Sequence, residues 1–115
     1  MSLNYSNLME NKSDKEDSVE FSIQDPEIFN PDIKEVTVFY NIVGDARFKL
    51  FKNNKSELIL VHVTDNWMRQ AKIDISKCSR KLDIKITWNK ECDVLSVKCD
   101  EEQNYNDVKA IQIDN

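Results

Sequence analysis

Hydrophobic and polar residues alternate most regularly between Lys81 and Cys99. The apolar positions of the first arm are two residues apart: Leu82, Ile84, Ile86 and Trp88. The second arm repeats this spacing: Leu95, Val97 and Cys99. A period of two is typical of a strand that buries one face. Because the link at 89–93 is short and polar, the pattern predicts an antiparallel β-hairpin.

Similar alternation predicts further strands along the chain, at 19–23, 35–42, 46–51, 57–63, 68–75 and 108–113. The segment 57–63 is almost continuously apolar, which predicts a central strand covered on both faces. In 35–42 we expect one face to carry Val36, Val38, Tyr40 and Ile42. In the last strand we expect Ala110 and Ile111 to be buried. About eight strands without a helical stretch predict an all-β fold, a single antiparallel β-sandwich of jelly-roll or galectin-like type.

The chain of 115 residues is long enough for one domain. Residues 1–18 are polar and acidic and are predicted to be disordered or loosely attached, so the sandwich is expected over 19–115. Net charge is −5 in 1–34, +4 in 35–99 and −4 in 100–115. The simplest interpretation is that acidic ends keep the chain solvated; the alternative is that an acidic end screens the basic body until an anionic partner arrives. The basic excess is too small to predict nucleic-acid binding, and no apolar run is long enough to predict membrane insertion.

Cysteine usage bears on metal binding and on the cellular compartment. The chain has three cysteines: Cys78, Cys92 and Cys99. With no CxxC motif and a single histidine, we expect no metal site and no cofactor. Free thiols in a cytoplasmic protein are the simpler interpretation. If a leader was removed and the protein is secreted, a Cys92–Cys99 disulfide across the hairpin is possible, and the Asn-x-Ser sequons at Asn4, Asn11 and Asn54 become relevant.

Candidate chemistry is sparse. His62 lies in the most apolar strand without a nucleophile motif near it, so a structural role is favoured over a catalytic one. The only glycine, Gly44, cannot build a phosphate-binding loop, and we predict that the protein is not an enzyme. Trp67 follows the polar turn 64–66 and has Asn66 and Arg69 beside it. This arrangement suits stacking on a sugar or anchoring a partner, whereas the alternative is that Trp67 packs over the edge of the core.

Three blocks between residues 36 and 99 resemble the farnesoic acid O-methyltransferase-like domains, which are similar to galectin-like sandwiches. The blocks are 44–50, an acidic turn that leads into a strand; 57–70, two strands joined by a turn with Trp and Asn; and 82–97, a strand that ends in Trp followed by a return strand. The resemblance implies a lectin-like fold without a site for S-adenosylmethionine. The strand that would carry the galactoside ligands in galectins offers Arg47, Lys49 and Lys52 here, so only Trp67 and Arg69 match that family's site.

These observations predict a non-enzymatic binding or protein-interaction module. A protein partner is favoured, and the alternative is a carbohydrate-binding module that uses Trp67. The residues expected to make contact are Trp67, Arg69, Asn66 and Arg47. The oligomeric state is left open.

Overall fold

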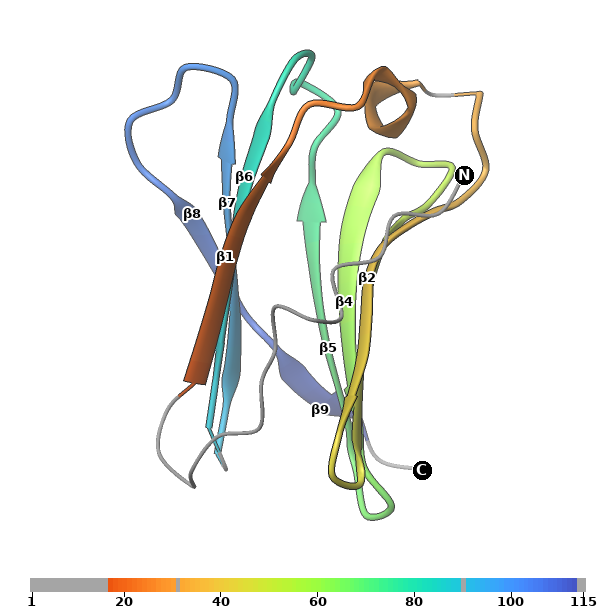
Figure 1. The fold of residues 1–115 in the computed structure, drawn as a ribbon, viewed down its shortest axis with the longest axis vertical. Helices are drawn as coiled ribbons and strands as arrows, with labels where there is room; N and C mark the ends of the chain where they lie inside the picture. Colours follow the sequence, from red (N-terminus) through yellow and green to blue (C-terminus); the bar gives the residue numbers. More distant parts are fainter. Residues whose placement is uncertain (1–16, 31, 90, 114–115) are drawn as a thin grey trace.

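The computed structural model describes residues 17–30, 32–89 and 91–113, and they form two antiparallel sheets that face each other (Figure 1). The four-stranded sheet has the order β1-β6-β7-β8, with β1 Asp17–Ile23, β6 Leu82–Trp88, β7 Asp93–Cys99 and β8 Asn106–Lys109. The five-stranded sheet has the order β2-β3-β4-β5-β9, with β2 Val36–Val43, β3 Ala46–Lys52, β4 Glu57–Val63, β5 Met68–Asp74 and β9 Ile111–Ile113. A 3-10 helix, η2 Pro26–Phe29, connects the sheets between β1 and β2. The predicted all-β sandwich is therefore confirmed, with nine strands in the described residues.

Strands β6 and β7 form the predicted antiparallel hairpin, in which Ile86 lies opposite Leu95 and Ile84 opposite Val97. These inward side chains are almost fully buried against those of the five-stranded sheet, including Phe39, Phe48, Leu50, Leu58 and Leu60. Strand β4 is the middle strand of its sheet, as predicted, but its outer face is only partly covered, since Val61 and Val63 are half-buried. The predicted loose segment 1–18 lies outside the described residues except for its last two, which belong to β1.

Strand β2 departs from the predicted alternation. The pairing of β2 with β3 shifts by one residue between Thr37 and Phe39, which is the mark of a β-bulge. Val38 and Phe39 are consequently both buried, whereas Tyr40 and Ile42 turn to solvent. The prediction that Val36, Val38, Tyr40 and Ile42 share one face is wrong beyond the bulge, because a shift of one residue sends every later side chain to the opposite face.

The predicted last strand is divided between the two sheets. Strand β8 pairs with β7, and β9 pairs with β5. The chain crosses from one sheet to the other at Ala110, whose backbone N–H donates to the Asp93 carbonyl oxygen at 2.9 Å. The expected burial of Ile111 is wrong, because this side chain lies on the outer face of β9 with 72% of its surface exposed.

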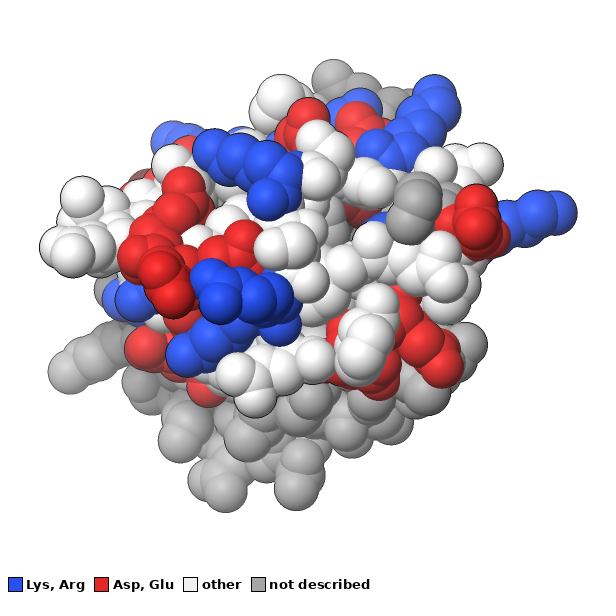
Figure 2. Space-filling view, turned by 90° about the horizontal axis from the view of Figure 1, so that it is seen from above, with Lys and Arg blue, Asp and Glu red and all other residues white. Residues whose placement is uncertain are grey.

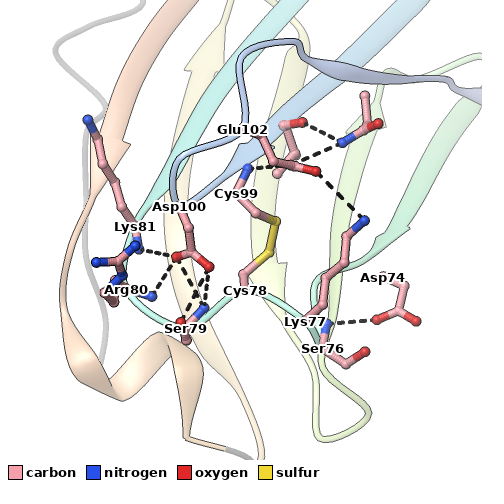
Figure 3. Close-up of a disulfide and its surroundings, with 12 residues drawn as sticks. Asp74, Ser76, Lys77, Cys78, Ser79, Arg80, Lys81, Cys99, Asp100 and Glu102 are labelled. Carbon is pink, nitrogen blue, oxygen red and sulfur yellow. Dashed lines mark hydrogen bonds and ion pairs between the residues drawn. A yellow bond between two sulfur atoms is a disulfide. The ribbon is translucent and has the colours of Figure 1, made fainter.

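A disulfide joins Cys78, in the link between β5 and β6, to Cys99 at the end of β7 (Figure 3). Cys92 is a free, half-exposed thiol. The Cys92–Cys99 pairing considered above does not form, because the two residues lie at opposite ends of β7, about 20 Å apart at the rise of an extended strand. Two of the three expected free thiols are thus paired.

Asp100 secures the same end of the sandwich. Its backbone has a positive φ of 52°, and its carboxylate accepts hydrogen bonds from the backbone N–H groups of Ser79, Arg80 and Lys81 at 2.7 to 3.3 Å. The Arg80 N–H contributes most to holding the pKa of this carboxyl below its usual value, because hydrogen bonds favour the charged form.

Lys52 is buried at the far end of β3, although the resemblance places it among ligand-facing positions. Its Nζ donates to the backbone oxygens of Asn30 at 3.0 Å and Ile33 at 3.3 Å. Burial lowers the pKa of this amine, since desolvation disfavours the charged form. Lys52 therefore ties the β1–β2 connection to the sheet rather than meeting a ligand.

Candidate functional site

Three polar side chains meet between the sheets and are almost inaccessible: His62, Arg69 and Asp93. His62 Nδ1 lies 2.8 Å from one oxygen of the Asp93 carboxylate, and Arg69 NH1 lies 3.1 Å from the other. The same Arg69 nitrogen is 3.3 Å from the backbone oxygen of Asn89. We call these three residues the buried charge cluster.

Strand alternation explains why these residues face inward. His62 has the same parity as Leu58 and Leu60 in β4, and Arg69 lies directly opposite His62 in the register of β4 and β5. Asp93 opens β7 on the inward face of the other sheet. The cluster therefore joins the sheets by charge-assisted hydrogen bonds across the interior.

Aromatic rings enclose the cluster. The His62 ring stacks on Phe48 with centroids 3.8 Å apart, and the Trp67 ring meets His62 edge-on at 4.8 Å. The Arg69 guanidinium lies over the Trp67 ring, 3.9 Å from its centroid. Buried ion pairs persist only when their hydrogen-bonding groups are satisfied. In the described part of the chain, no buried side-chain nitrogen or oxygen lacks a partner.

An imidazole oriented by a carboxylate is also one part of a hydrolytic triad. Here the Asp93 carboxylate is shared with Arg69, and Phe48 and Trp67 cover the imidazole on two sides. Among the described residues, the His62 side chain has Asp93 as its hydrogen-bond partner and no hydroxyl or thiol. This geometry suits a structural connection between sheets and offers no nucleophile to the imidazole.

The four residues expected to form a contact site are not brought together. Trp67 and Arg69 point inward and stack on each other, with Trp67 half-buried and Arg69 buried. Asn66 is exposed at the β4–β5 turn, where its backbone N–H donates to Thr64 Oγ1 at 3.2 Å. Arg47 is exposed on the opposite, outer face of the five-stranded sheet, beside Ile42 on one strand and Val63 on the other.

The outer face of the five-stranded sheet carries an apolar surface that the sequence did not reveal. The large hydrophobic side chains that are exposed in the described residues all belong to it: Tyr40 at 41%, Ile42 at 56% and Ile111 at 72%. Half-buried apolar side chains of β4, β5 and β9 lie on the same face: Val61, Val63, Met68 and Ile113. We call these seven residues the outer apolar surface. The signal that was available, alternation in β2, was misread because the bulge could not be located.

Two cations accompany this surface. In the register of β2 and β3, Tyr40 lies opposite Lys49 and Ile42 opposite Arg47. Lys49 forms an ion pair of 3.5 Å with Glu35, whereas no carboxylate of the described residues lies within ion-pairing distance of Arg47. Because β3 lies between β2 and β4, these two cations cross the outer apolar surface and separate Tyr40 and Ile42 from its part on β4, β5 and β9.

The end of the sandwich with the disulfide has mixed charges instead. Figure 2 views this end and shows basic and acidic side chains interspersed. Exposed ion pairs account for several of them, Lys77 with Glu102 at 3.7 Å and Arg80 with Glu101 at 3.2 Å among them. The depression lined by Gln24, Arg80, Lys81, Asp100 and Glu101 lies here, and all four of its charged side chains already have partners within the chain.

No three His, Cys, Asp or Glu side chains of the described residues are arranged to hold a metal ion. The described chain also has no helix long and apolar enough to cross a membrane.

Comparisons with protein-family models, with curated proteins and with solved structures each found no match to this chain. The resemblance of residues 36–99 to farnesoic acid O-methyltransferase-like and galectin-like domains consequently stays a prediction.

Proposed function

We propose that this protein is a non-enzymatic interaction module that binds a protein partner through the outer apolar surface. The observation that carries the proposal is the exposure of Tyr40, Ile42 and Ile111 on one face of one sheet. Exposed apolar groups gathered on one face favour association, because burying them removes apolar area from water. Arg47 and Lys49 beside them favour a partner whose apolar contact residues are accompanied by carboxylates.

Carbohydrate binding through Trp67 is the weaker alternative. A sugar stacks on an open aromatic face, and one face of the Trp67 indole is covered by the Arg69 guanidinium at 3.9 Å. The ring is also half-buried beside His62. A sugar that used this face would have to displace Arg69 from a position where it also bonds Asp93.

Site-specific photocrosslinking tests the proposal directly. A photoreactive amino acid replaces Ile42 on the outer apolar surface and, in the control, Thr87 on the outer face of β6. We expect crosslinks to one specific protein from position 42 and none from position 87 in the cells that produce the protein. If the partner's contact segment is acidic, we expect Arg47→Glu to abolish the crosslink from position 42.

Binding of the wild-type protein to an array of glycans tests the alternative. Sugar binding that disappears in a folded Trp67→Phe variant, together with no crosslink from position 42, would reject the protein-interaction proposal. Sedimentation over a range of concentrations determines whether the crosslinked partner is a second copy of the chain.

A further inference from the structure

The turn between β3 and β4 contains two adjacent asparagines with different surroundings. Asn53 builds the turn: its Oδ1 accepts from the backbone N–H groups of Lys55 at 2.9 Å and Glu57 at 3.0 Å. Its Nδ2 donates to Glu57 Oε1 at 2.8 Å. The turn is therefore held by Asn53, and its neighbour Asn54 is not needed for it.

Asn54 is exposed at the tip of this turn, and its carboxamide forms no hydrogen bond with the described residues. It begins the sequence Asn54-Lys55-Ser56, which is an acceptor sequon for N-linked glycans. Ser56 is half-exposed and is fixed by its backbone oxygen, which accepts from Ile75 N–H at 2.9 Å. A glycan on Asn54 would displace no contact of the fold.

The disulfide supplies the second observation. Cys78 and Cys99 are both buried where the β5–β6 link meets the end of β7. Structural disulfides form and persist in oxidising compartments and are rare in the cytoplasm. N-linked glycosylation takes place in such a compartment, so the disulfide and the sequon point to the same cellular route.

We propose that Asn54 is an N-glycosylation site and that the protein matures in the secretory pathway. The sugar donor is a polyprenyl-diphosphate-linked oligosaccharide. A bond forms between Asn54 Nδ2 and the anomeric carbon of the first sugar, the bond from that carbon to the diphosphate oxygen breaks, the polyprenyl diphosphate leaves, and the amide loses one proton. Asn54 and the β2–β3 turn lie at opposite ends of β3, so the glycan leaves Ile42 and Arg47 accessible (Figure 1).

The test uses the full chain, secreted from eukaryotic cells behind a cleavable leader. Mass spectrometry of peptides, with and without peptide N-glycosidase, reads each sequon separately, including those at Asn4 and Asn11, which lie outside the described residues. We expect a glycan on Asn54 that is lost in Asn54→Gln and in Ser56→Ala. The matched variant Lys55→Ala keeps the sequon and is expected to keep the glycan. If secretion is poor, glycan occupancy of the same sequons can be measured on chain that has been translated into microsomes.

The second test asks whether the disulfide is present in the natural protein. The protein is taken from the cells that naturally make it, denatured, and alkylated without reduction. We expect only the Cys92 thiol to be alkylated. An unmodified Asn54 in secreted protein, or three reactive cysteines in the natural protein, would overturn the proposal. Either result leaves the proposed role of the outer apolar surface intact, because that role does not depend on the glycan.

Discussion

Removing the charge of Asp93 is the most informative perturbation of this fold. Asp93→Asn keeps the shape of the side chain but removes the negative charge that faces Arg69 at 3.1 Å and His62 at 2.8 Å. The Arg69 side chain, of which only 5% is exposed, would then lose the Asp93 carboxylate as a buried counter-charge.

The expected cost follows from this burial. Breaking a buried ion pair by neutralising one partner typically costs about 3–5 kcal/mol, because the other charge stays desolvated. For a domain whose free energy of unfolding is roughly 5–15 kcal/mol, this is a large share. With a urea m-value of about 2 kcal/mol/M, a loss of about 4 kcal/mol lowers the urea midpoint by about 2 M.

Equilibrium urea titration followed by circular dichroism measures the effect. The control is Asp107→Asn, an exposed carboxylate on β8 whose loss is expected to cost under about 0.5 kcal/mol. In the double-mutant cycle with Arg69→Met, the combined cost should fall short of the sum of the single costs by about 1–3 kcal/mol. An Asp93→Asn variant within about 1 kcal/mol of wild type, or strictly additive costs, would refute the view that the cluster joins the sheets by charge.

Other predictions concern the disulfide, Asp100 and Trp67. Because the disulfide spans 21 positions, replacing Cys78 and Cys99 by Ala should lower the free energy of unfolding by about 3 kcal/mol in urea titration, whereas Cys92→Ala should cost under about 1 kcal/mol. Asp100→Asn retains a residue that tolerates positive φ but removes the charge. Since the pKa of Asp100 in the folded protein lies below the usual aspartate value of about 3.9, the stability advantage of the wild type should be complete above about pH 3.9 and vanish as pH falls through the folded pKa in acid titration. Trp67→Ala should cost about 2 kcal/mol, because the ring is half-buried, and a cost under about 1 kcal/mol would favour an exposed contact residue instead.

Alternation predicted the strands well because each sheet buries one face. The β6–β7 hairpin and its buried face were predicted, since every second residue of β6 is buried and every intervening one is partly exposed. The alternation of apolar and polar residues could not locate the bulge in β2, because a bulge is defined by how the strand pairs with its partner strand. The division at Ala110 was hidden for a similar reason: a crossing between sheets depends on where both sheets lie.

The buried charge cluster shows a different limit. Arg69 was noticed, but as a surface residue, and Asp93 was assigned to the hairpin link. Both stand at inward positions of their strands, as does His62, so the signal was three polar residues in inward register. A single strand cannot reveal that a cation in one sheet faces an anion in the other, because that pairing arises only when the sheets pack.

The disulfide and the crossing at Ala110 fasten the two sheets to each other at opposite ends of β7. At one end the connection is the disulfide, and at the other it is the continuous backbone that passes from β8 in one sheet to β9 in the other. Because the two sheets are connected at both of these ends, they cannot separate to admit a molecule between them. We therefore expect any molecule that this protein recognises to bind to the outer faces or the ends of the sandwich and not between its sheets.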